Sequence, residues 1–166
     1  MPLYGGSSGS SGTPLSTCPI GTLTGQVNVY QNSYVWGGMV FAGDILIINS
    51  YTIYVYQTAA GNAQVAMYTT TDGNIVTNST SAIGSCSSAG LLTMTLSTPI
   101  TLTKGVSYYL ACNCTANGSL FAAGTASSFN NPPKPAWTAT SSSGVFPSTL
   151  GTLNGSASVV WIQANT

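Results

Sequence analysis

The sequence predicts an all-β domain built as a sandwich of two sheets, and three observations carry this prediction. Apolar and polar residues alternate with a period of two in many short stretches, as in Tyr34 with Trp36 and Ile53 with Val55. Such alternation is typical of half-buried strands. Residues that favour turns, above all Gly and Asn, separate these stretches. No stretch of the chain has a helical period, so we expect an architecture without helices.

The alternation predicts about eight strands, and many of them are enriched in Thr, Val, Ile and Tyr, which favour strands. They lie near residues 25–31, 34–41, 44–49, 51–58, 63–70, 91–97, 106–115 and 157–163. Turn signals at 41–44, 60–62, 71–74 and 103–105 lie between them. Many short strands joined by Gly-rich turns favour a sandwich of jelly-roll type.

Two segments fall outside this strand pattern. Residues 130–153 begin with Asn-Asn-Pro-Pro-Lys-Pro, and the sequence that follows is rich in Ser. Because Pro cannot donate a hydrogen bond to a neighbouring strand, we expect a long surface loop there. Residues 1–19 are mostly Gly, Ser, Thr and Pro and cannot form a core of their own. The sequence therefore divides into an extended arm, 1–19, and a β-sandwich domain, 20–166.

The arm has two interpretations that the sequence leaves open. It is either a disordered tail or a segment that docks on a neighbouring subunit and becomes ordered there. In the second interpretation the apolar residues Leu3, Tyr4 and Leu15 make the assembly contacts.

Charge is the most unusual property of the chain. Charged residues make up 2% of it, and they are Asp44, Asp72, Lys104 and Lys134. Roughly 25% is usual for soluble domains. With a formal net charge of zero, copies repel one another little, so we expect a homo-oligomer or a subunit of a larger assembly.

The same scarcity of charge argues against several functions. Two Lys and no Arg are too few cations for nucleic-acid binding. No apolar run approaches the roughly 20 residues that span a bilayer. The N-terminus has neither the basic start nor the apolar stretch of a secretory signal, so we expect synthesis in the cytoplasm.

Catalysis and cofactor binding are also poorly supported. The chain has no His, Glu or Arg, and its two Asp residues stand in separate predicted turns, so we expect no enzyme. The 71–74 turn has too few carboxylates for Ca²⁺. The cysteines Cys18, Cys86, Cys112 and Cys114 lack the paired spacing of a zinc site. We expect no cofactor. We expect the cysteines to be buried thiols, and the alternative is a disulfide from Cys112 or Cys114 to Cys18 or Cys86.

Two stretches carry a resemblance to a known group of proteins. They are Ala63-Gln-Val-Ala-Met-Tyr-Thr-Thr-Thr-Asp-Gly-Asn-Ile-Val76 and Leu92-Thr-Met-Thr-Leu-Ser-Thr-Pro-Ile-Thr-Leu-Thr-Lys-Gly-Val-Ser-Tyr-Tyr-Leu-Ala111. Together they resemble β-sandwich modules of tailed-phage virion proteins and of some bacterial surface adhesins. The resemblance implies a jelly-roll-like fold and a place in a phage virion.

These observations lead to one main functional hypothesis and two alternatives. The main hypothesis is a head decoration (cement) protein, a trimer that clamps neighbouring copies of the major capsid protein. The first alternative is a glycan-binding tail or adhesin module that uses Trp137, the tryptophan expected in a loop, since Trp36 and Trp161 lie in predicted strands and are expected in the core. The second alternative is an extracellular filament subunit that assembles by strand addition.

Overall fold

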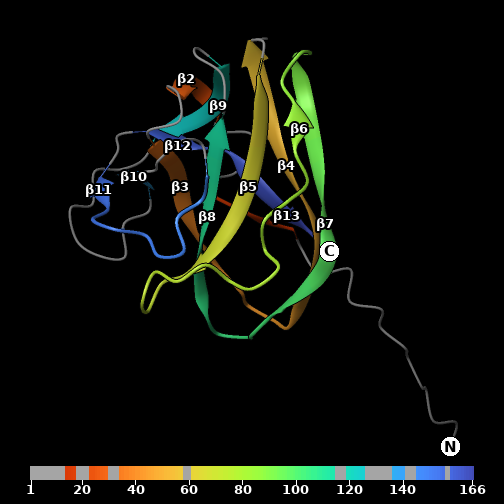
Figure 1. Ribbon diagram of the computed structural model, residues 1–166, viewed down its shortest axis with the longest axis vertical. Helices are drawn as coiled ribbons and strands as arrows, with labels where there is room; N and C mark the ends of the chain where they lie inside the picture. The colour runs from red at the N-terminus through yellow and green to blue at the C-terminus, as the bar shows by residue number, and fades with distance from the viewer. Residues whose placement is uncertain are drawn as a thin grey trace, which may run out of the picture.

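The structure is a computed structural model that describes residues 14–17, 23–29, 34–57, 61–114, 119–125, 136–140, 145–155 and 158–166. These residues form two antiparallel sheets packed face to face, and no helix occurs among them (Figure 1). The structure therefore confirms the predicted all-β sandwich. No described segment has the length and apolar character of a helix that spans a membrane.

The first sheet has seven strands and contains both the earliest and the last described strand. Its main path runs through β1 (Leu15–Ser16), β13 (Ile162–Asn165), β4 (Leu46–Gln57), β9 (Ser119–Thr125) and β12 (Ser158–Val160). Two further strands extend it: β2 (Leu23–Val29) pairs with β9, and β7 (Gly90–Leu102) pairs with β4.

The second sheet has six strands and lies nearest the viewer in Figure 1. Its order is β11 (Asn154–Gly155), β10 (Ala136–Thr140), β3 (Tyr34–Phe41), β8 (Ser107–Cys114), β5 (Asn62–Thr69) and β6 (Gly84–Ser85). We refer to the two layers as the seven-stranded and the six-stranded sheet.

The main core lies between the sheets. It consists of the alternate inward residues of both layers, with Tyr51, Ile53 and Val55 from β4 facing Val65, Met67 and Leu110 from β5 and β8. This is the burial that the period-two pattern predicts.

A second, smaller core covers the outer face of the six-stranded sheet. Residues 145–153 lie over this face, where Leu150 joins Tyr68, Tyr109 and Ala111, and Phe146 packs on the rim. Tyr68 also donates a hydrogen bond from its hydroxyl to the carbonyl of Pro147 at 2.9 Å. Because both faces of β8 are covered, seven of its eight residues are buried, which explains why its sequence is apolar without alternation.

The strand boundaries correct the sequence analysis in four places. The predicted strand 157–163 is divided into β12, which pairs with β9, and β13, which pairs with β4. The predicted strands 44–49 and 51–58 are one strand, β4, in which the pairing register with β7 shifts between Ile48 and Ser50. The predicted loop 130–153 contains β10, which pairs with β3 from Ala136 to Thr140. Strand β9 was not predicted.

The edge of β5 is completed by serine side chains rather than by a full strand. Ser79 donates its hydroxyl to the carbonyl of Met67 at 3.0 Å and accepts the amide of Met67 at 3.1 Å. Ser81 accepts the amide of Val65 at 3.1 Å, and its own amide donates to the Val65 carbonyl at 2.9 Å. These bonds satisfy backbone groups that β5 would otherwise leave unpaired.

Candidate functional site

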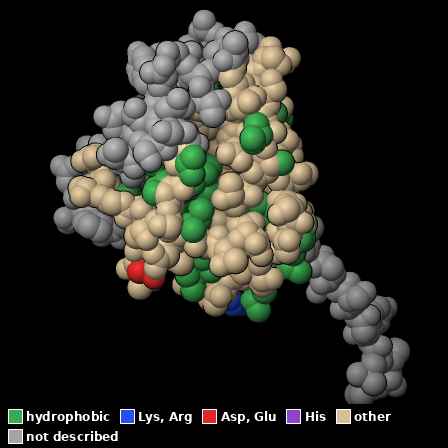
Figure 2. Space-filling model, viewed as in Figure 1, with side chains coloured by type: hydrophobic (Ala, Val, Ile, Leu, Met, Phe, Trp, Pro, Cys, Tyr) green, Lys and Arg blue, Asp and Glu red, His purple; other side chains and the backbone are tan. Residues whose placement is uncertain are grey.

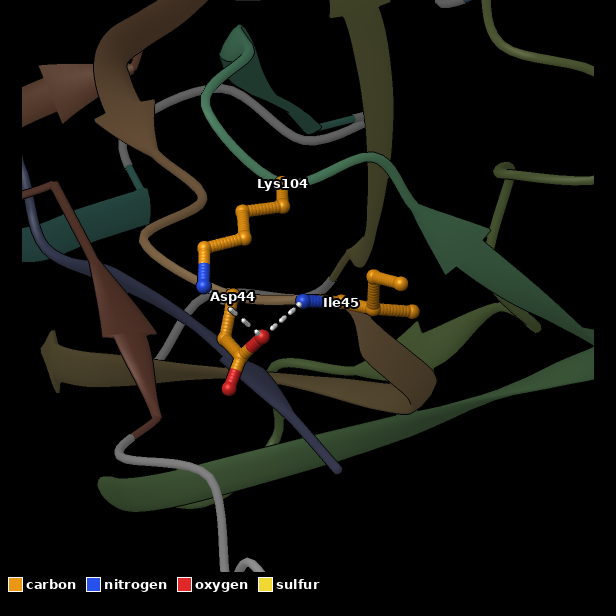
Figure 3. A network of polar contacts seen from close by, with 3 residues as sticks. All are labelled: Asp44, Ile45 and Lys104. Atoms are coloured by element: carbon orange, nitrogen blue, oxygen red, sulfur yellow. Dashed lines mark hydrogen bonds and ion pairs between the residues drawn. The ribbon is translucent and has the colours of Figure 1, made fainter.

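The ion pair between Asp44 and Lys104 joins the turn between β3 and β4 to the turn between β7 and β8. Lys104 Nζ lies 3.7 Å from Asp44 Oδ1, and the same oxygen accepts the Ile45 amide at 2.9 Å (Figure 3). Both side chains are more than 60% exposed. A pair this exposed contributes under about 1 kcal/mol, so its role is local, in fixing the turn.

Asp72 lies in the turn that follows β5, where its carboxylate is held by hydrogen bonds. Oδ1 accepts the hydroxyl of Thr69 and, at 3.2 Å, the amide of Asn74, while Oδ2 accepts the Asn74 side-chain amide at 2.6 Å. These bonds, led by that from Thr69, hold the pKa of Asp72 below its ordinary value. The carboxylate is therefore ionised and fixed in orientation.

The two Asp residues thus serve two different turns, and the structure does not place them in one site. The described part of the chain also contains no group of three residues of the His, Cys, Asp or Glu type that could hold a metal ion.

A shallow cleft opens beside Asp72, and we call it the turn cleft. Its volume is about 230 Å³. It is lined by Thr70, Thr71, Asp72, Gly73, Tyr109, Leu150, Gly151 and Leu153. One wall is the turn after β5, drawn in yellow at the lower left of Figure 1, and the other is the blue segment beside it, residues 150–153. Sequence analysis did not find this cleft, because its walls lie about 80 residues apart along the chain.

Uncharged polar side chains form a hydrogen-bonded row on the outer face of the seven-stranded sheet, which we call the polar ladder. It consists of Ser50, Thr52, Thr93, Gln163 and Asn165. Thr52 and Thr93 share a hydrogen bond of 2.9 Å between their hydroxyls. The Asn165 amide donates to Ser50 at 3.1 Å and to Thr52 at 2.9 Å, and Gln163 donates to Asn165 at 2.7 Å. The ladder crosses three strands and contains no charge.

Several large apolar side chains are also exposed. They are Phe41, Ile45, Ile47, Tyr56, Ile83, Leu91 and Val145. Ile47, Tyr56 and Leu91 belong to β4 and β7, the strands that carry much of the polar ladder. Figure 2 shows the opposite side of the molecule, that of the six-stranded sheet, where red and blue appear only in small patches near the lower edge.

The predicted arm residues fall in different parts of the structure. Leu15 lies in β1, opposite Ala164 of β13, and packs half-buried against the main core of its own chain. Thr17 continues this attachment, since its hydroxyl donates to the Val160 carbonyl at 2.7 Å. Leu3 and Tyr4 lie outside the described residues, so the predicted contact of the arm with another subunit stays a prediction.

The tryptophans are only partly described. Trp161 is buried, as expected, and Trp36 is half-buried against the main core. The backbone of Trp137 belongs to β10 and pairs with Gly37 and Gly155, rather than lying in a loop. Its side chain lies outside the described part of the chain, so its predicted glycan contact is untested.

Three of the four cysteines lie in the main core. Cys86, Cys112 and Cys114 are fully buried. Cys112 and Cys114 point to the same face of β8, as their spacing predicts. Burial, and secondarily the nearby Cys114, raises the pKa of the Cys112 thiol far above its ordinary value, so it stays protonated. Cys18 lies outside the described residues.

The fold and these surfaces define the chain as a β-sandwich domain of very low charge. The sequence matches no protein-family model and no curated protein.

Proposed function

We propose that this chain is a structural virion protein of a tailed phage, a head decoration protein that stabilises the capsid by contacts with neighbouring capsid subunits. It works by burying surface, without catalysis and without a cofactor. The observation that carries the proposal is the outer face of the seven-stranded sheet, where the polar ladder lies among exposed apolar side chains and none of its own members is charged.

Such a face suits a permanent contact between proteins. Burying an ion costs several kcal/mol unless it is well paired, whereas uncharged groups that already hydrogen-bond one another are removed from water at lower cost. Exposed Ile47, Tyr56 and Leu91 add apolar area to the contact. The face therefore favours association with a matching, equally uncharged surface.

The position of β1 adds support, because it brings the N-terminal segment to the edge of this face. Ser16 lies opposite Gln163, which belongs to the polar ladder. The 13 residues before the first described one span up to about 45 Å when extended. An arm of that reach, leaving from this edge, can extend to an adjacent subunit.

Cosedimentation with undecorated phage heads, together with light scattering, tests the proposal. We expect the full chain to form a homo-oligomer, with a trimer as the expected state, and to bind heads. Removing residues 1–13 should weaken head binding at least tenfold and leave the fold unchanged, because β1 is retained. A stable monomer that ignores heads would overturn the proposal.

A pair of surface variants tests the face itself. Leu91→Lys places a charge on the seven-stranded sheet, while Val145→Lys places the same charge on the segment over the other sheet, at a similarly exposed position. Because an unpaired lysine resists burial, only Leu91→Lys should reduce head binding. Equal loss in both variants would contradict the assignment of this face.

A further inference from the structure

The turn cleft combines features that the assembly proposal does not use. Its two walls are fixed to each other: the Leu150 amide donates to the Gly73 carbonyl at 2.9 Å, and the Thr149 hydroxyl donates to the Asn74 side-chain carbonyl at 2.8 Å. The Ile75 amide adds a bond to the Ser148 carbonyl at 2.9 Å. The cleft is therefore formed before any ligand arrives, which lowers the cost of binding.

One wall offers a charged hydrogen-bond acceptor. The Asp72 carboxylate accepts the Thr69 hydroxyl and two bonds from Asn74, and the Asp72 amide also donates to it. The carboxylate is exposed at the edge of the cleft, so a ligand hydroxyl can reach it. Lys104 pairs with Asp44, so among the described residues no lysine pairs with Asp72.

The remaining lining is apolar or small. Tyr109 and Leu150 form a nearly buried apolar floor beneath the cleft, and Leu153, which is half-buried, contributes aliphatic surface. Gly151 leaves its side open, since a Cβ there would meet no atom within 4 Å. The cleft thus has one strongly polar wall and one apolar wall.

This combination selects a class of ligand. A phosphate or another anion is repelled by Asp72, and one carboxylate supplies too few oxygens for Ca²⁺. A purely apolar ligand would leave the carboxylate desolvated without a partner. A neutral sugar ring satisfies both walls, because its hydroxyls donate to a carboxylate in charge-assisted bonds and its C–H face packs on aromatic and aliphatic carbon.

We propose that the turn cleft binds one neutral sugar residue of a glycan, with Asp72 accepting its hydroxyls and Tyr109, Leu150 and Leu153 contacting its ring. The volume of about 230 Å³ lies below the range of roughly 300–1,000 Å³ for drug-sized ligands, which fits one ring rather than a buried chain. A single ring with few contacts binds with a dissociation constant on the order of 1 mM. The site is independent of the decoration role proposed above.

NMR titration of the ¹⁵N-labelled full chain tests the proposal. The ligands are the methyl glycosides of glucose, galactose, mannose and N-acetylglucosamine, with sorbitol as a polyol that lacks a ring. We expect at least one glycoside to give saturable shifts at the amides of Thr71, Gly73, Tyr109 and Gly151, and sorbitol to give none. Absence of saturable shifts at these amides with all four glycosides would overturn the proposal.

Two matched pairs of variants locate the binding. Gly151→Leu fills the open side of the cleft and should weaken binding at least tenfold, whereas Gly43→Leu makes the same change at a distant turn where a Cβ is equally unhindered. Asp72→Asn removes the charge and should weaken binding fivefold or more, whereas Asp44→Asn should not. Binding that Gly151→Leu leaves unchanged would refute the site, whatever the outcome of the head-binding experiment.

Discussion

Gly84 shows how a single missing side chain shapes the edge of this sandwich. A Cβ at this position would lie 2.7 Å from Cγ and 2.9 Å from Sδ of Met94, and 3.0 Å from a methyl group of Leu92. The β6 backbone therefore lies directly on the side chains of β7, and no larger residue fits without displacing them. Gly43, in contrast, has open space around it.

Gly84→Ala is accordingly expected to destabilise the protein by about 1–2 kcal/mol, since overpacking of a well-filled core has costs of this size. Urea denaturation measures the change in the free energy of unfolding. Gly43→Ala, the matched control, should change it by less than about 0.5 kcal/mol. Equal effects of the two substitutions would show that the contact with Met94 does not limit residue 84.

Asp72 gives the stability of the chain a defined dependence on pH. Because its pKa is lowered in the folded state, this carboxylate contributes stability that is fully present above its ordinary pKa of 3.8 and is lost as the pH falls through the lower folded value. Thermal unfolding between pH 5 and pH 2 should therefore show a decline that is shallower in Asp72→Asn. An identical pH profile in the variant would contradict the role of the Thr69 and Asn74 bonds.

Among the elements, the segment that completes the β5 edge is expected to be sensitive to the loss of one hydroxyl group. Ser79 is buried, and its hydroxyl satisfies the amide of Met67 and donates to the carbonyl of that residue. Ser79→Ala leaves the amide buried without that partner, which costs about 1–3 kcal/mol in the free energy of unfolding. Thr80→Ala, at the neighbouring exposed position, is the control and should cost much less. Chemical denaturation of both variants distinguishes the two outcomes.

Strand positions were predicted to within a few residues where the pattern alternates, as in β7, although β7 extends further than expected. They were also predicted where both faces of the strand are covered, as in β8, because its residues favour strands even without alternation. The register shift at Ser50 was not predicted, because a local irregularity resembles a turn when only the pattern is read.

Strands β9 and β10 escaped prediction for different reasons. The β9 sequence, Ser-Leu-Phe-Ala-Ala-Gly-Thr, is rich in small residues and lacks alternation. Strand β10 directly follows a Pro-rich stretch, and its pairing with β3 depends on residues about 100 positions away. The turn cleft was missed for the same reason, since pattern analysis detects local periodicity and not contacts between distant segments. Its one local signal was the Asp72-Gly73 turn.

At the scale of the whole molecule, the first described residues of the chain pack and hydrogen-bond against its last strands. Residues 15–17 pair with the last strand: Leu15 packs on the main core, and Thr17 exchanges three hydrogen bonds with the backbone of Val160 and Ile162. The N-terminal segment is therefore not uniform, because its last residues belong to the sandwich.

Two truncations measure this contribution. Removing residues 1–13 should leave the free energy of unfolding unchanged, while removing residues 1–17 should lower it by about 2–4 kcal/mol through lost apolar burial and lost hydrogen bonds. The midpoints of urea unfolding report both values. If the longer deletion had no effect, β1 would be dispensable for the fold.

The burial of Cys112 has a practical consequence. Alkylating reagents react with an exposed thiolate, and this thiol is neither exposed nor ionised in the folded protein. Alkylation of Cys112 therefore takes place only when the sandwich opens, so its rate depends on how often the sandwich opens. Peptide mass spectrometry measures this rate. The alkylation rate of Cys112 therefore reports how often the sandwich opens. It can be measured in the free chain and again once the chain is bound to a partner.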